Sequence, residues 1–178
     1  MWFASSIKTM AFERTTDYEL VRAILTDPGL YGHMTDDFAP AREAFRVNEH
    51  PAIWYVLVRD AGGDLMGMFC FFPESAICWA VHVAMRRGIA PAVTWQAGRE
   101  IVEWLWAHTG CLRLIASVPV CNRAAVRFGL GAMGLKAYGR NKASSMKGGK
   151  LWDQVLMGCS KEAFSLQPSA ISLKKCGE

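Results

Sequence analysis

Residues 81–92 read V-H-V-A-M-R-R-G-I-A-P-A, a run that begins as an apolar strand and ends in two arginines, a glycine and small residues. The following residues up to His108 predict a helix, because apolar side chains recur at every fourth position from Val93. Such a turn leaves unpaired backbone N–H groups at the helix N-terminus, where the helix dipole adds positive charge. The run is therefore typical of a phosphate-binding loop, although an ordinary strand-to-helix turn has the same pattern.

The bulk composition indicates one folded domain. The chain has 178 residues, of which 52% are hydrophobic and 20% charged, and this composition excludes a largely disordered protein. The net charge of +4 is uneven, because residues 1–60 carry 6 basic and 9 acidic side chains and residues 137–178 carry 7 and 3. A basic second half is suited to binding an anion, such as a phosphorylated cofactor or nucleic acid. An ordinary solvated surface that binds no ligand explains the same charge distribution equally well. We expect a core over about residues 8–163 and a loose tail over 164–178.

The six cysteines have no CxxC and no zinc spacing, and several lie in apolar runs, where cysteine behaves as a small hydrophobic residue. The most apolar region, residues 65–85, is interrupted by Pro73, Glu74, Ser75 and His82, so it predicts two strands and no membrane span. No secretory signal is visible. We therefore expect a reducing, cytoplasmic location and no metal site.

The expected order of elements is β-α-α-β-β-β-α-β-α-β-β. The strands and helices that make up this order are expected over residues 8–14, 15–25, 40–45, 53–60, 65–72, 76–85, 92–108, 112–118, 123–133, 135–141 and 151–159. Such an order predicts an α+β fold with one mixed, mostly antiparallel sheet and helices on both faces.

This order and two motifs resemble the GNAT (N-acetyltransferase) superfamily over roughly residues 8–163. The cofactor loop of that family follows the pattern Arg/Gln-x-x-Gly/Ala-x-Gly/Ala. The run from Arg87 to Ala92 fits this pattern, and the run from Met85 to Ala90 fits it with methionine at the first position. The second family motif, Asn-x-x-Ala-x-x-Phe, is matched by Asn122, Ala125 and Phe128.

The resemblance implies acetyl-CoA, or another acyl-CoA, as the cofactor. Backbone groups of Val83 and Met85 would bind the pantetheine arm, and one strand amide would polarise the thioester carbonyl as an oxyanion-hole donor does. The loop implied to hold the pyrophosphate comprises Arg86, Arg87, Gly88, Ile89, Ala90 and Ala92. Asn122, together with Ala125 and Phe128, would complete the site and take part in catalysis, although Asn122 also fits a simple helix cap.

One departure from the family concerns the general acid. Many members have a tyrosine directly after the phenylalanine of the second motif, whereas this chain has Gly129. The acid is therefore unassigned, and Cys121, Ser117 and Tyr138 are the alternatives. Because a thiolate is a tolerable leaving group, a missing acid would slow the reaction without preventing it.

His82 is the candidate general base. A primary amine must lose a proton in order to attack, and a base with a pKa near 7 removes it best. The competing interpretation is a hydrogen-bonded histidine in the core. Glu74, just before the same strand, is a second candidate base.

The acceptor amine is expected between the loop after the first helix and the last hairpin. Tyr31, His33 and Asp36 lie in that loop, where Asp36 and its neighbour Asp37 could attract an amine. Asp153 in the last strand is a candidate inward-facing acid. For each of these carboxylates, an ordinary solvated charge is the alternative.

Three functions fit these patterns. The first is N-acyl transfer to a primary amine of a small molecule or a protein, by an enzyme whose Trp-rich helix allows a homodimer. The second is a catalytically degenerate binding or structural protein of phage or mobile-element origin, since the run from His82 to Gly158 also resembles acetyltransferase-like proteins of bacteriophages. A nucleic-acid-directed activity ranks last, because no Arg-rich recognition helix or aromatic platform is visible.

Overall fold

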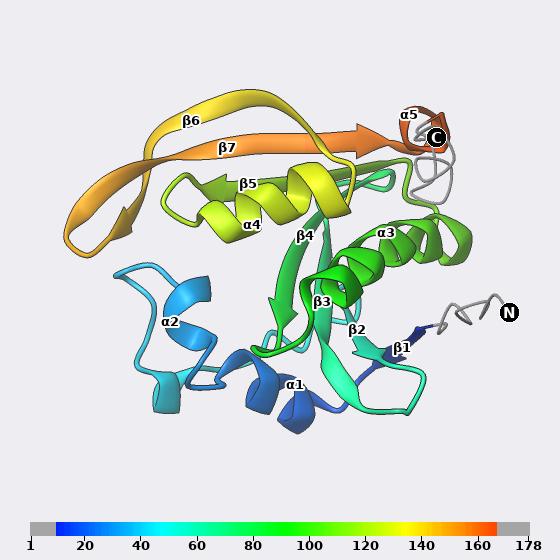
Figure 1. The fold of residues 1–178 in the computed structure, drawn as a ribbon. Helices are drawn as coiled ribbons and strands as arrows, with labels where there is room; N and C mark the ends of the chain where they lie inside the picture. Colours follow the sequence, from blue (N-terminus) through cyan, green and yellow to red (C-terminus); the bar gives the residue numbers. More distant parts are fainter. Residues whose placement is uncertain (1–9, 167–178) are drawn as a thin grey trace, which may run out of the picture.

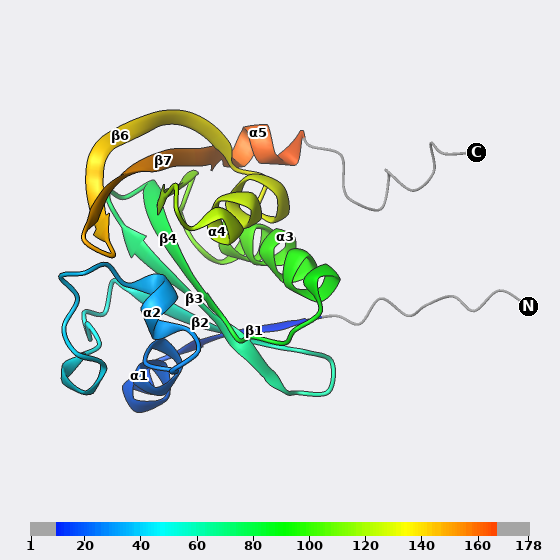
Figure 2. The same ribbon diagram turned by 60° about the vertical axis from the view of Figure 1, so that its left-hand side comes forward.

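The structure is a computed structural model that describes residues 10–166, which form one seven-stranded sheet with helices on both faces (Figures 1 and 2). The strands lie in the order β1-β2-β3-β4-β5-β7-β6, and every neighbouring pair is antiparallel except β4 and β5. Their bounds are β1 Ala11–Thr15, β2 Trp54–Arg59, β3 Leu65–Pro73, β4 Cys78–Met85, β5 Arg113–Pro119, β6 Lys136–Lys147 and β7 Lys150–Ser160. The expected mixed, mostly antiparallel α+β sheet is confirmed.

Helical segments lie between these strands largely as the sequence predicts, and one further helix, which was not predicted, follows β7. Their bounds are α1 Tyr18–Leu25, α2 Tyr31–Met34, η1 Arg42–Ala44, α3 Pro91–His108, α4 Arg123–Arg127, η2 Phe128–Ala132 and α5 Lys161–Ser165. Here η1 is a single 3-10 turn, and η2 is a π-helical turn that continues α4. No helix within residues 10–166 combines the length and the apolar character that a membrane crossing needs.

The second helix does not lie where the sequence predicts it. Residues 40–45 form only the 3-10 turn η1, and α2 lies earlier in the chain. The guanidinium of Arg22 in α1 donates to the carbonyl oxygens of Phe45 (3.2 Å) and Glu43 (3.0 Å) and holds this turn against α1. So short a segment gains few helical hydrogen bonds to offset the cost of nucleation, and the backbone is extended at Phe45, where the turn ends.

The two ends of the domain also differ slightly from expectation. The first strand begins at Ala11, and residues 8 and 9 of the predicted strand lie outside the described residues. The expected tail begins later than residue 164, because Phe164 belongs to α5 and is only 2% exposed. The rest of the predicted tail, residues 167–178, lies outside the described part of the chain.

The sheet separates two apolar clusters. On one face, α3 and the α4–η2 segment cover a large core that contains Phe69, Phe71, Ile101, Leu105 and Leu114. On the other face, α1 covers a smaller core. Because side chains alternate along a strand, Val81 and Val83 of β4 point into the large core, and His82 and Ala84 point toward the face of α1.

Gly98 lets α3 and η2 approach closely. A Cβ atom at this position would lie 2.7 Å from Cζ of Phe128 and 2.9 Å from Cβ of Ala132. Glycine in a helix costs about 1 kcal/mol relative to alanine, and the close packing of two helical segments on the large core offsets that cost. The contact holds the α4–η2 segment beside α3. The start of α4 lies near the end of β5 because few residues separate Pro119 from Arg123.

Candidate active site

The centre of the candidate site is a V-shaped gap between β4 and β5. The two strands pair only from Cys78 opposite Arg113 to Ala80 opposite Ile115. Beyond these three positions they diverge, with β4 staying on β3 and β5 staying on β7 (Figure 1). One edge of residues 81–85 and one edge of residues 116–119 therefore lack a partner strand among the described residues. Free strand edges offer backbone N–H and C=O groups to a ligand that lies along them.

The loop between β4 and α3 ends at an uncapped helix N-terminus. Gly88 has φ +85°, a conformation that glycine adopts easily, and it turns the chain away from the sheet. Ala90 is the N-cap residue of α3, and its side chain makes no capping hydrogen bond. Pro91 occupies the first turn, where its missing N–H costs nothing. In this first turn the N–H of Val93 donates to the carbonyl oxygen of Ala90 at 3.0 Å, so the amide of Ala92 is the one left to face an anion there.

The two arginines of this loop point in different directions. Arg86 donates from Nη1 to the carbonyl oxygen of Leu65 at 3.2 Å, back toward the β2–β3 hairpin. Arg87 reaches the other way, and its Nη2 contacts Nε2 of His33 in α2. Arg87 therefore lies at the wide end of the V.

His33 bridges the two strand ends across the wide end of the V. Its ring meets Arg87, which follows β4, and its carbonyl oxygen accepts a hydrogen bond from Nδ2 of Asn122, which follows β5, at 3.3 Å. Asn122 also accepts from the backbone N–H of Ala125 at 3.2 Å, so it caps α4. The helix-cap interpretation of Asn122 is therefore confirmed, and its role in the cofactor site and in catalysis stays a prediction.

His82 lies on β4 two positions beyond the last residue paired with β5. Its side chain is exposed to solvent, its ring lies 5.1 Å from that of Phe72, and the described residues offer it no hydrogen-bond partner. A hydrogen-bonded core histidine is therefore not what the fold contains. The surrounding protein partly desolvates the ring, which lowers the pKa of His82 from its ordinary value of 6.5. Desolvation disfavours the charged form, so the imidazole is neutral at neutral pH and able to accept a proton.

Ser117 occupies the matching position on the other side of the V. It lies two residues beyond Ile115, the last residue of β5 that pairs with β4. Its neighbours Ala116 and Val118 join the large core, so Ser117 points to the same face of the sheet as His82, and its side chain is exposed. Of the three alternative donors, it is the one that this geometry places opposite the candidate base.

The other two alternative donors lie elsewhere. Tyr138 is on β6, where its ring is 5.3 Å from the guanidinium of Arg113 at the narrow, paired end of the V. Cys121 precedes Asn122 at the wide end and is half-buried. A side chain at position 129 would have to displace Met157, because a Cβ there would lie 2.5 Å from its Sδ.

Several implied cofactor residues use their side chains for packing. Phe128 stacks on Phe69 with ring centroids 6.4 Å apart, and Val83, Met85 and Ile89 pack against the large core. Their side chains are thus occupied, and contact with a cofactor would fall to backbone groups, as the resemblance implies for Val83 and Met85. Glu74, the second candidate base, lies in the turn before β4, at its paired end and away from the gap.

The predicted acceptor loop does meet the last hairpin, and of the residues named for it Asp37 makes that contact whereas Tyr31 and Asp36 do not. The hydroxyl of Tyr31 donates to the carbonyl oxygen of Pro40 at 2.6 Å, and Asp36 accepts from the N–H of Phe38 at 3.0 Å, so both side chains shape their own loop. Asp37 instead bonds the β6–β7 turn. Asp153 pairs with Lys142 at 3.3 Å and with Arg140 at 3.7 Å, and so is not an inward-facing acid.

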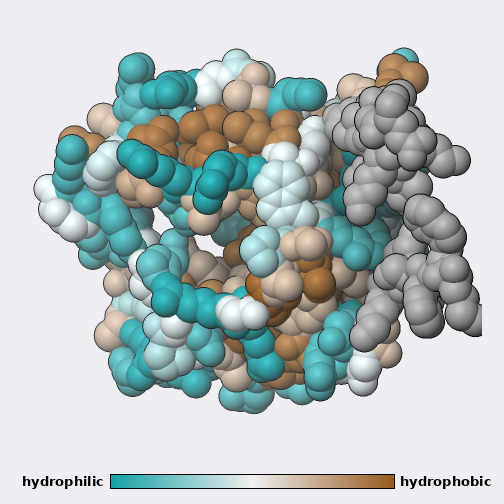
Figure 3. Space-filling view, viewed as in Figure 1, coloured by the Kyte–Doolittle hydropathy of each residue, from teal (hydrophilic) through white to brown (hydrophobic). Residues whose placement is uncertain are grey.

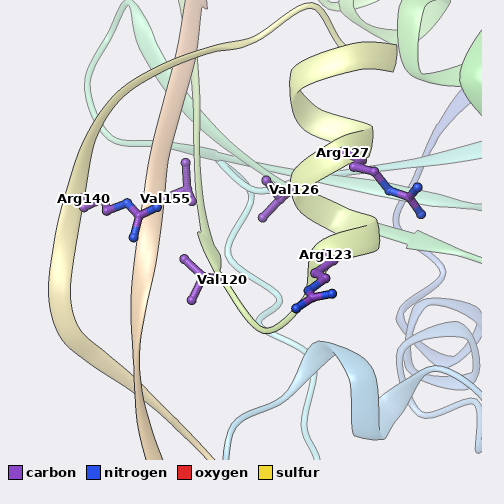
Figure 4. A pocket seen from close by; sticks show the side chains of 6 residues that line it. All are labelled: Val120, Arg123, Val126, Arg127, Arg140 and Val155. Atoms are coloured by element: carbon purple, nitrogen blue, oxygen red, sulfur yellow. The ribbon is translucent and has the colours of Figure 1, made fainter.

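An open groove of about 520 Å³ lies between α4 and the β6–β7 hairpin, outside the V (Figure 4). Val120, Val126 and Val155 line its floor, with Arg123 and Arg140 beside them. Val126 and Val155 pack on the large core, so the groove opens on the face opposite His82. Residues 10–166 contain no cluster of histidine, cysteine and carboxylate side chains that fits a metal ion.

Comparison with proteins of known structure identifies the fold. The spermidine N-acetyltransferase of Vibrio cholerae, solved with CoA and spermine, superposes with a TM-score of 0.71 at 11% identity, over 88% of this chain and 98% of that one. A GNAT-superfamily phosphinothricin acetyltransferase of Sinorhizobium meliloti, solved with AcCoA, has a TM-score of 0.66 at 16% identity, over 92% and 94%. A GNAT-family acetyltransferase of Streptococcus pneumoniae has a TM-score of 0.65 at 17% identity, over 85% and 99%. The fold is that of the GNAT acetyltransferases.

Sequence comparison adds nothing to this result, since no protein-family model and no curated protein matches the chain. The GNAT fold is thus present with the V between β4 and β5 and the arginine-bearing turn before α3. These features fit the requirements of an acyl-CoA: free strand edges for an amide-rich arm, and an uncapped helix N-terminus with Arg87 for phosphates.

Sequence reasoning missed two features of the site. The position of Ser117 opposite His82 depends on where the pairing of β4 with β5 stops, and no local pattern marks that point. The contact of Asp37 with the β6–β7 turn joins residues more than a hundred positions apart. The glycines of the K-G-G-K turn were the available signal, because two adjacent glycines allow successive amides to face one acceptor.

Proposed function

We propose that the protein is an acyl-CoA-dependent N-acyltransferase that moves an acetyl group from acetyl-CoA to a primary amine. The observation that carries this proposal is the V between β4 and β5, with His82 on one side and an arginine-bearing, uncapped helix N-terminus at its wide end. Two similar folds were solved with CoA or AcCoA bound. Neither the composition nor the fold specifies the acceptor.

His82 acts in this proposal as the general base. The amine nitrogen attacks the thioester carbonyl carbon, and the imidazole of His82 accepts the proton that the nitrogen loses. A C–N bond forms, the C–S bond breaks, and the sulfur leaves with the bonding electron pair as a thiolate. The proton on His82 then passes to solvent. A neutral imidazole is needed at the start, and the lowered pKa of His82 supplies it at neutral pH.

Ser117 acts as a hydrogen-bond donor to the charge that develops across the V. A serine hydroxyl is too weak an acid to protonate the thiolate fully, but it can stabilise an oxyanion or a leaving sulfur. We expect Ser117→Ala to lower kcat by about 10²-fold, with little change in the affinity for acetyl-CoA. Release of CoA thiol in steady state, with Ser117→Thr as the control that keeps the hydroxyl, measures this effect. Equal kcat values for Ser117→Ala and the wild type would remove Ser117 from the mechanism.

Calorimetric titration tests the proposal as a whole. We expect the purified protein to bind acetyl-CoA and CoA with dissociation constants of about 1 μM to 1 mM, the range in which enzymes hold their substrates. A panel of primary amines, with CoA release as the readout, then tests transfer. Absence of acetyl-CoA binding at millimolar concentration would contradict the proposed function.

One observation favours a second candidate function, a GNAT-fold protein that binds its ligand without catalysis. The usual tyrosine position is Gly129, which packs against Met157, so the chain has no phenol hydroxyl at this position. Binding of acetyl-CoA without transfer to any amine would support this alternative. Phage or mobile-element origin, a cytoplasmic location and a homodimer remain predictions from the sequence.

A further inference from the structure

A network of hydrogen bonds fastens the segment Gly32–Asp37 to the β6–β7 turn. The carboxylate of Asp37 accepts from the backbone N–H groups of Gly148 (2.9 Å) and Gly149 (2.7 Å), and its own N–H donates to the carbonyl oxygen of Met146 (3.0 Å). In the opposite direction, Nζ of Lys147 donates to two carbonyl oxygens of the segment, those of Gly32 and Thr35. We call these contacts of Asp37 and Lys147 the clasp.

The β6–β7 turn is shaped to receive a carboxylate. Gly148 and Gly149 have φ values of +62° and +68°, and two successive residues in this left-handed region direct their amides toward one acceptor. The amides of Gly149 and Gly148 hold the pKa of Asp37 below its ordinary value of 3.8. Asp37 therefore stays ionised, and the clasp stays formed, throughout the neutral range.

The same segment is anchored at its other end to the wide end of the V. His33 contacts Arg87 after β4 and Asn122 after β5. The segment thus crosses from the V to the tip of the β6–β7 hairpin, and both ribbon views show these parts side by side (Figures 1 and 2). In the space-filling view, the surface has an opening beside the junction of the segment and the hairpin, between the regions of α4 and α2 (Figure 3). β4, which carries His82, ends at Met85, two residues before the Arg87 that contacts the segment.

From this geometry we infer that the clasp closes the acceptor side of the V into a passage, so that only slender, unbranched primary amines reach His82. This inference rests on the proposed function and narrows its substrate class. The end of an alkylamine chain enters such a passage, whereas an amine on a bulky cage or on the surface of a folded protein does not. Asp37 is a positioning residue in this scheme, because it acts through the segment it holds.

Chemical labelling of His82 with reagents of two sizes tests the passage without requiring turnover. Diethyl pyrocarbonate and the bulkier di-tert-butyl dicarbonate both acylate neutral imidazole, and peptide mass spectrometry separates His82 from His108. His108 is exposed on α3, far from the clasp in sequence, and serves as the internal reference. For each reagent, the measured quantity is the labelling of His82 divided by the labelling of His108. In the wild type, we expect this ratio to be at least about tenfold lower for the bulky reagent than for the small one.

Opening the clasp should remove this discrimination. We expect Asp37→Ala to raise the labelling of His82 by the bulky reagent at least about fivefold. A segment that few contacts hold in place opens readily when some of them are removed. Asp36→Ala is the matched control, since Asp36 bonds only within its own loop and should leave the ratio unchanged. Lys147→Met opens the clasp from the hairpin side, and serves if Asp37→Ala fails to fold.

The outcomes separate this inference from the proposed function. Equal labelling of His82 by both reagents in the wild type, or no change on opening the clasp, overturns the passage even if acetyl-CoA binds. Where transfer is measured, butylamine should be acetylated and 1-adamantylamine should not, and Asp37→Ala should reduce that preference. A merely structural role for Asp37 would lower both rates alike. Failure of the wild type to bind acetyl-CoA contradicts the proposed function and leaves the labelling result standing.

Discussion

We expect His82→Gln to lower kcat for amine acetylation by about 10²- to 10⁴-fold, the usual contribution of a positioned general base. Binding of acetyl-CoA should be unchanged, because the ring of His82 faces the α1 side of the sheet and the proposed phosphate contacts lie at the loop before α3. Steady-state release of CoA and calorimetric titration of the same variant measure the two quantities. Loss of the fold on substitution would instead indicate that His82 is a packing residue.

The pH dependence of the wild type gives an independent check on His82. Desolvation lowers its pKa from 6.5, so the base loses activity only when the pH falls through that lowered value. The acidic limb of log(kcat/KM) should therefore have its midpoint below pH 6.5, and His82→Gln should abolish this limb. His108→Gln on α3 is the matched control, and its profile should follow that of the wild type. A limb that persists in His82→Gln would assign the base to another group.

We expect Arg87→Glu to weaken acetyl-CoA binding by at least about 100-fold. Removing a charged hydrogen-bond partner of a ligand phosphate costs 2 kcal/mol or more, and a reversed charge adds repulsion. Arg87 lies at the wide end of the V, where its Nη2 meets His33. Calorimetric titration with acetyl-CoA measures the change, and circular dichroism checks the fold.

Arg86→Glu is the matched control for this prediction. It reverses the same charge one residue away, but the side chain of Arg86 points back to the carbonyl oxygen of Leu65. We expect a loss of affinity at least about tenfold smaller than for Arg87→Glu, because long-range charge effects are screened by salt. Equal losses in the two variants would mean that the loop contributes only a general positive field.

The architecture was predictable because its elements are defined by short-range patterns. The four-residue spacing of apolar side chains predicted α3 to within one residue of its start, and β-branched and aromatic runs predicted β2, β3 and β4. The helix expected at residues 40–45 is only a 3-10 turn, which Arg22 in α1 holds through the carbonyls of Glu43 and Phe45. Local propensity is a weak prior wherever a distant side chain competes for backbone groups.

The candidate site was predictable only in part. The loop at Arg87 and the cap at Asn122 each follow from a few adjacent residues, and both lie where the sequence suggests. Tyr31 and Asp36 were expected to face an acceptor, but their polar atoms bond within their own loop. Sequence composition marks such residues as polar and cannot state which partner each one finds.

The sequence by itself determined the order of the seven strands, and it predicted a phosphate-binding loop before α3 and His82 as the candidate base, because each of these depends on residues close together in the chain. Only the tertiary structure decided where β4 and β5 part, that Ser117 faces the same side as His82, and that Asp37 clasps the β6–β7 turn. The physical reason is that strand pairing and charged hydrogen bonds join residues distant in sequence. Their partners are chosen by the packing of the whole domain around its two cores.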